Sequence, residues 1–431
     1  MIGRYSALFG MNFLISCVTM SSAFAVDPDQ AMIDKGRTIY SRLTGKKPKI
    51  SDPKFIQMVG LLKAGKNIEA AAIATDDAGF VNNTLRLFAA PIHNASQSYR
   101  QTELSESMAF IMGKIRDRAD YREILTGKDY YVPDLTGITC NDNEDNYRCA
   151  DRQGLDLSSK LMHATAPARP IFKATVQKID GKDVRDTYPT ELPNGDVDRS
   201  GIFTQDGFAY AGYRAGTNRR VLQQFFNTMY CVPNNAMRAS ALVQDRWVGP
   251  DVSRDPEGTG LATYKAECRT CHGATFDGLR GAFAYLDGAM AGESNTNGRT
   301  ITIYDPSKVN AKYSRNSSNY PNGYRTIDNS WELMWTEAQR AQFGWDGGGS
   351  LSGVGVHSLA VTLSHFDQLP RCMVQKVAEL VCPVDPNATQ SGSNQLLSDQ
   401  LKTELVAQLK KTGDVRKIFE QIAVRPECLG K

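Results

Sequence analysis

The chain has 431 residues, of which 41% are hydrophobic and 23% charged, a composition near the globular average. These values exclude a collagen, a disordered tail protein and a polytopic membrane protein. The 50 Lys and Arg and 47 Asp and Glu give a net charge of +3 at pH 7. No basic stripe long enough to follow a phosphate backbone stands out, so we expect no nucleic-acid partner. The length suggests several domains.

The start of the chain, 1–25, has the features of an export signal. Arg4 precedes an apolar run from Tyr5 to Met20, and small residues end at Ala25. We expect cleavage there and a periplasmic or otherwise exported product in the cell envelope. A competing cleavage in a lipobox-like sequence would leave Cys17 lipidated as an anchor. The apolar run is shorter than the roughly 20 residues of a membrane span, and no later segment reaches that length, so we expect no transmembrane span in the mature chain.

Residues 26–130 are predicted to form a helical domain. Apolar residues recur at three- and four-residue steps from Phe55 to Leu62, the spacing of one helix face. Asp52 and Ser105 stand where a side chain can cap the first turn of a helix. We therefore expect helices to begin just after each of them.

The middle of the chain, 131–245, is predicted to be loop-rich because Gly, Asp, Asn and Pro interrupt every longer pattern. It ends in a helix expected over about 217–230. A Pro- and Asp-rich linker follows at 245–258. Residues 288–330 are rich in Asn, Ser, Gly and Tyr and are expected to be irregular. Further helices are predicted at about 330–342, 355–382, 398–411 and 414–424.

The most informative motif is Cys-Arg-Thr-Cys-His at 268–272, the sequence form of a covalent haem c site. Two thiols three positions apart at the end of a helix face the same way and can add to the two vinyl groups of a porphyrin. The next residue brings its imidazole under the iron. We interpret Cys268 and Cys271 as the thioether residues and His272 as the proximal iron ligand. One such motif is present, so we expect one haem c.

Two other interpretations of this motif are weaker. A redox disulfide would require a thioredoxin-like βαβ setting, and half of a zinc site would require a second Cys or His pair nearby. The motif favours a mainly α protein in which 255–431 is an all-α, cytochrome c-like haem domain.

The sixth iron ligand is left open between two residues. Met334 follows His272 at a separation that small cytochromes often use, and His357 begins a Gly-flanked helix. Each also has an ordinary structural interpretation, Met334 in the core and His357 as a helix cap. A Met ligand is typical of a high-potential electron carrier, whereas a vacant position permits ligand binding or peroxide chemistry.

Cysteine spacing constrains the disulfides of an exported chain. Once the signal is removed, the count is eight, and an even number suggests pairing or covalent capture. Cys140 and Cys149 close a polar loop and are expected to pair. Cys372 and Cys382 lie in one helical pattern, about 15 Å apart, beyond the roughly 7 Å limit for a disulfide. We expect one of them to pair with Cys231 and the other with Cys428.

The chain resembles the planctomycete-type multidomain cytochrome c proteins, exported proteins with a single CxxCH and flanking domains of unknown function. The resemblance rests on the haem motif and on several shorter stretches: Gly201–Thr204, Gly216–Arg220, Cys231, Gly281–Tyr285, Gly344–Asp346, and Phe366 to Cys382 with Leu369 and Cys372. It implies haem binding and electron transfer in the cell envelope. This chain has Ala274–Asp277 where related sequences often carry a Met in a Gly-Met-Asp-Pro stretch, so no ligand transfers from that position.

The favoured interpretation is an exported monohaem c-type cytochrome that transfers electrons to a redox partner protein in the envelope, rather than a catalyst. A second hypothesis is a haem enzyme or small-ligand sensor with an open sixth position. A third is an envelope adhesion or assembly protein with an ancillary haem, since about 240 residues precede the motif, far more than a simple carrier needs.

Overall fold

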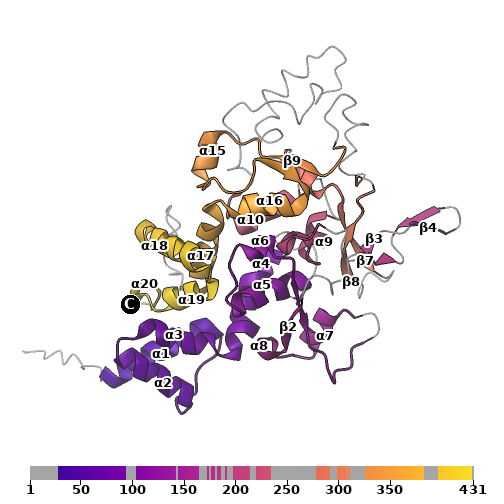
Figure 1. Cartoon of the computed structure of the whole chain (residues 1–431). Coiled ribbons are helices and arrows are strands. Elements are labelled where there is room, and N and C mark those ends of the chain that lie inside the picture. The colour runs from indigo at the N-terminus through magenta and orange to yellow at the C-terminus, as the bar shows by residue number, and fades with distance from the viewer. Residues whose placement is uncertain are drawn as a thin grey trace, which may run out of the picture.

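The computed structural model describes residues 28–93, 103–141, 144–164, 172–173, 176–179, 182–185, 190–191, 198–213, 220–233, 278–291, 299–307, 309–310, 326–382 and 397–429. The protein is mainly α, as predicted (Figure 1). One apolar core runs through the described residues from Ile39, near the start of the chain, to Cys428, near its end.

Helices form most of the N-terminal part, where side-chain caps set several of their starts. Asp52 accepts a hydrogen bond from the amide of Lys54, and Ser105 accepts one from the amide of Met108, which confirms both predicted caps. The helices here are α1 (Pro28–Thr44), α2 (Pro53–Lys63), α3 (Asn67–Thr75), the π-helix η1 (Phe80–Leu85), α4 (Arg86–His93), α5 (Glu106–Arg116) and α6 (Glu123–Thr126).

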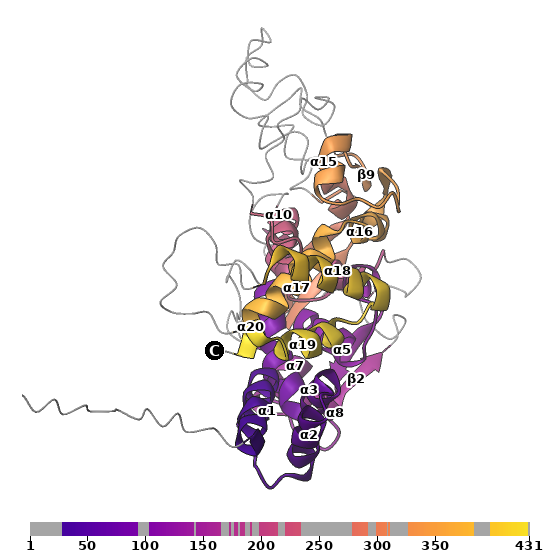
Figure 2. The ribbon, with the colours of Figure 1, turned by 90° about the vertical axis from the view of Figure 1, so that its left-hand side faces the viewer.

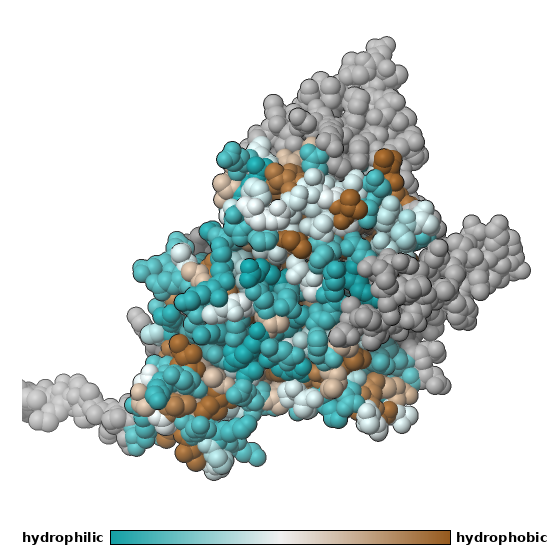
Figure 3. Space-filling view, in the orientation of Figure 1, coloured by the Kyte–Doolittle hydropathy of each residue, from teal (hydrophilic) through white to brown (hydrophobic). Residues whose placement is uncertain are grey.

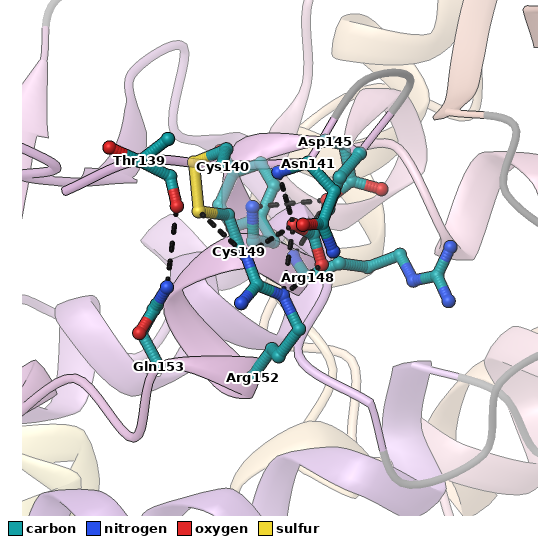
Figure 4. The surroundings of a disulfide bond; sticks show 10 residues. Thr139, Cys140, Asn141, Asp145, Arg148, Cys149, Arg152 and Gln153 are labelled. Carbon is teal, nitrogen blue, oxygen red and sulfur yellow. Dashed lines mark hydrogen bonds and ion pairs between the residues drawn. A yellow bond between two sulfur atoms is a disulfide. The ribbon is translucent and has the colours of Figure 1, made fainter.

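A small antiparallel pair joins this part to the middle of the chain. Strands β1 (Tyr130–Pro133) and β2 (Leu161–Ala164) pair with each other. Between them in the sequence are the helices α7 (Asn146–Arg152) and α8 (Leu157–Lys160). The Cys140–Cys149 disulfide ties α7 to the preceding loop, as Figure 4 shows. Beyond β2, the structure describes β3 (Phe172–Lys173), β4 (Val176–Ile179), β5 (Lys182–Arg185) and β6 (Thr190–Glu191).

The next elements pack against the helical core. They are the 3-10 turn η3 (Gly201–Thr204), α9 (Phe208–Tyr213) and α10 (Arg220–Met229), the last of which confirms the predicted helix near 217–230. Side chains on one side of α10, including Leu222, Phe225 and Phe226, are fully buried. Tyr230, just past its end, donates a hydrogen bond of 2.6 Å to the carbonyl of Leu363. The middle of the chain is therefore fastened to the C-terminal helices.

The expectation that the C-terminal region is all-α is wrong. It contains η7 (Arg280–Phe283) and four strands: β7 (Leu286–Ala291), β8 (Arg299–Tyr304), β9 (Ser330–Glu332) and β10 (Ser352–Val354). Strands β7 and β8 belong to a sheet of order β6-β3-β8-β7, although 288–330 was expected to be irregular. The β-branched residues of β8 favour an extended strand.

The C-terminal helices are α15 (Glu337–Gln342), α16 (Gly355–Ser364), α17 (Gln368–Val381), α18 (Asp399–Thr412), α19 (Val415–Ala423) and α20 (Pro426–Leu429). The single helix predicted over 355–382 is divided in two at His365–Asp367. Helix α19 lies beside α3 near the start of the chain, which both ribbon views show (Figures 1 and 2). Phe419 of α19 also packs edge-on against Phe80 of η1 and Phe88 of α4.

The disulfide predictions are confirmed. Cys372 bonds to Cys231 and Cys382 to Cys428, so the two ends of α17 are clamped to α10 and to the end of the chain. Among the described helices, none has the length and apolarity that a bilayer crossing requires.

Candidate functional site

The predicted haem residues divide between two parts of the chain. Cys268, Cys271 and His272 lie outside the described residues. The two candidates for the sixth ligand, Met334 and His357, lie within them. The next described residue after His272 is Gly278, six positions further along the chain. The residues around Gly278 are therefore those nearest in sequence to the haem motif whose contacts are known.

Gly278 lies against the strand that leads to Met334. Its carbonyl accepts a hydrogen bond of 2.8 Å from the amide of Glu332 in β9. A Cβ placed on Gly278 would clash with the carbonyl of Glu332 and lie 3.1 Å from the Sδ of Met334. The sulfur of Met334 thus lies where a side chain on Gly278 would otherwise be, six positions after His272 in the sequence.

Burial alternates along the chain on both sides of Met334. Trp331, Leu333 and Trp335 are buried, whereas Glu332 and Met334 are half-buried. This alternation places Met334 on the opposite face from its two buried neighbours. A helix was predicted over about 330–342, but only its second half forms one, α15; the alternation of Trp331, Leu333 and Trp335 is a strand signal, and β9 lies there.

Close packing holds this strand in place. A Cβ on Gly281, in η7, would clash with the carbonyl of Ser330, so this contact requires glycine. On the other side, the indole of Trp331 donates a hydrogen bond of 2.7 Å to the hydroxyl of Ser358 in α16. Trp335 packs at 5.2 Å from the ring of Phe366. The segment that begins at Gly278 and the segment that bears Met334 therefore pack together.

His357 lies in a different setting, in the first turn of α16. Its Nδ1 is 3.4 Å from the hydroxyl oxygen of Ser200, which itself donates a hydrogen bond of 2.8 Å to the carbonyl of Leu125. The cap interpretation of His357 is wrong. The carboxylate of Asp198 accepts hydrogen bonds from the amides of both Val356 and His357 and satisfies this helix end from a distant part of the chain.

Burial shifts the pKa values of Asp198 and His357 in the directions that favour their uncharged forms. Desolvation raises the pKa of Asp198, although the hydrogen bonds that its carboxylate accepts from the two amides partly offset the effect. Desolvation lowers the pKa of His357 below 6.5, and the charge of Lys128 lowers it further, while Asp198 opposes the change. His357 is therefore neutral at neutral pH.

This lowered pKa predicts a specific loss of stability in mild acid. Below pH 6.5 the unfolded chain binds a proton at His357 that the folded chain does not, so the free energy of unfolding falls until the pH passes the folded pKa. We expect His357→Gln to flatten this part of a stability-against-pH curve measured by urea unfolding. Lys128→Gln should reduce the slope because it removes a cause of the shift. Parallel curves for the wild-type chain and both variants would contradict the assignment.

The other described histidines have structural partners. His93 is buried beside the hydroxyls of Ser105 and Ser107, His163 contacts Asp129, and His365 contacts Asp346. Within the described ranges, no group of three or more His, Cys, Asp or Glu side chains is arranged to hold a metal ion.

Sequence reasoning missed Asp198, Ser200 and Gly278. Nothing near Asp198 in the sequence points to α16, because the two segments are far apart along the chain.

Comparison with known proteins adds no further assignment: no protein-family profile, curated protein or solved structure matches this chain.

Proposed function

We propose that the protein is an exported c-type cytochrome with one haem that transfers electrons in the bacterial cell envelope. The observation that carries the proposal is the CxxCH motif at 268–272. The predicted export signal supports it, because haem c is attached outside the cytoplasm. The resemblance to the planctomycete-type multidomain cytochrome c proteins points to the same function.

The use of the cysteines supports this interpretation. Three disulfides account for six of the nine cysteines in the sequence. Of the remaining three, Cys17 lies in the predicted signal, which leaves Cys268 and Cys271. The disulfides among the described residues use neither of these two thiols. Both remain for attachment of a porphyrin.

The chain's own residues would hold the group in stated roles. Cys268 and Cys271 would form the two thioether links, and His272 would bind the iron through its imidazole. We propose Met334 for the sixth position, because its Sδ would lie 3.1 Å from a Cβ placed on Gly278, six positions after His272 in the sequence. His357 is the weaker candidate, because its imidazole sits at the Asp198 and Ser200 junction with α16. When bound, the haem supplies one-electron oxidation and reduction at its iron.

Intact mass spectrometry of the exported protein tests the proposal. Expression in a host with a cytochrome c maturation system should yield a chain heavier by one haem, and the haem should resist acidic organic extraction. A variant with Cys268→Ser and Cys271→Ser should lose that mass. The matched control, Cys140→Ser with Cys149→Ser, removes two other cysteines and should retain the haem. A colourless wild-type protein with the mass of the bare processed chain would refute the proposal.

A further inference from the structure

The small net charge of the chain conceals a strongly basic segment. Residues 45–66 contain six lysines and one aspartate, a net charge of +5, in a chain whose total is +3. The rest of the protein is therefore slightly acidic. The segment consists of the loop after α1, the helix α2 and the turn before α3.

Helix α2 buries one side and presents the other to solvent. Phe55, Met58 and Leu62 face the core. Three isoleucines in and around this segment are exposed: Ile56 in α2 is 58% exposed, Ile50 in the preceding loop is 50% exposed and Ile68 in α3 is 39% exposed. Figure 3 shows brown patches among teal ones at the lower left, where Figure 1 has α1 to α3.

Little of this positive charge is neutralised within the described residues. Lys63 forms an ion pair of 2.7 Å with Asp29, and Lys46 lies 3.9 Å from Asp77. The other four lysines of the segment form no ion pair with any described residue: Lys47, Lys49, Lys54 and Lys66. All six lysines are exposed. We call the exposed lysines of 45–66, together with Ile50, Ile56 and Ile68, the basic face.

The basic face also lies beside the start of the first described helix. Helix α1 begins at Pro28, and the Lys63–Asp29 ion pair ties the end of α2 to the first turn of α1. Figures 1 and 2 both show α1 and α2 together at one end of the molecule. The sequence upstream of Pro28 contains the apolar run from Tyr5 to Met20. The basic face therefore adjoins the first turn of α1.

We propose that the basic face binds the surface of an anionic lipid bilayer. Lysines near an anionic membrane each strengthen binding, and exposed branched aliphatic side chains enter the boundary between headgroups and acyl chains. This mixture favours a membrane over nucleic acid, because the face lacks the exposed aromatic residues on which bases stack. Such binding would hold the protein at the membrane by its N-terminal helices.

Vesicle co-sedimentation tests this inference without reference to haem, so its result and that of the haem proposal are independent. The exported chain should carry Cys17→Ser in every sample, so that no acyl chain contributes to binding. It should bind vesicles of equal parts phosphatidylcholine and phosphatidylglycerol, and binding should weaken as salt is raised. Vesicles of phosphatidylcholine alone should not retain it.

Variants separate the contributions of charge and apolar contact. Lys47→Gln, Lys49→Gln and Lys54→Gln together should weaken binding to the anionic vesicles on the order of a hundredfold, about fivefold for each lysine. The matched control removes equal charge from α17 and α18 through Arg371→Gln, Lys402→Gln and Lys411→Gln and should bind normally.

Ile56→Ser should weaken binding at both low and high salt, because apolar contact is not screened, whereas Ile327→Ser, at a residue that is 76% exposed elsewhere, should not. Three results would overturn the inference. The first is an equal loss of vesicle binding in the control variant of α17 and α18, and the second is equal binding to anionic and neutral vesicles. The third is tighter binding to duplex DNA, or to polyglutamate as an acidic polypeptide, than to anionic vesicles.

Discussion

Replacement of Met334 by alanine is expected to make the reduced protein bind carbon monoxide, which the wild-type protein should not do. The thioether of Met334 lies beside Gly278, six positions after His272 in the sequence, and the side chain of alanine has no atom that can bind iron. Because a methionine ligand raises the reduction potential, the variant should also have a lower potential than the wild type. Optical spectra with and without the gas, and a redox titration, measure the two effects.

The control for this experiment is His357→Ala. It removes the competing imidazole but should leave the carbon monoxide response and the potential unchanged. If His357→Ala opens the site and Met334→Ala does not, the ligand assignment is reversed. If the wild-type protein already binds the gas promptly, the sixth position is vacant, and an enzyme or small-ligand sensor becomes the better hypothesis.

The largest effect on stability is expected at Gly201, where η3 begins. Its φ of +42° lies in a region that side chains rarely adopt, and a Cβ there would clash with the carbonyls of Ile124 and Leu125. Its amide donates a hydrogen bond of 2.6 Å to the carbonyl of Gly127, so the backbone cannot withdraw without losing this bond. We expect Gly201→Ala to lower the free energy of unfolding by about 2–4 kcal/mol, measured by urea denaturation.

A second glycine provides the opposite expectation. Gly60 lies inside α2, and a Cβ placed on it would meet nothing within 4 Å. Gly60→Ala should therefore raise the free energy of unfolding by about 1 kcal/mol, the difference in helix propensity between the two residues. Similar effects of the two substitutions would show that Gly201 does not pack against α6 as described.

Local patterns predicted many elements because the relevant forces act within a few residues. The caps at Asp52 and Ser105 depend on hydrogen bonds inside one helical turn. The disulfide partners of Cys372 and Cys382 could also be narrowed in advance, because the rise of a helix fixes their separation. Helix periodicity failed at 330–336, where buried residues alternate in an extended segment.

Local rules could not predict the contacts that determine the candidate site. Asp198 caps α16 from a segment far earlier in the chain, and Gly278 meets Met334 across a turn packed on β9. Such contacts depend on how whole elements pack, since a carboxylate or a sulfur atom has many equivalent partners until the core closes around one of them. The amino-acid order thus specifies the CxxCH chemistry, the cysteine framework and most helices, whereas packing selects the neighbours of Met334 and His357.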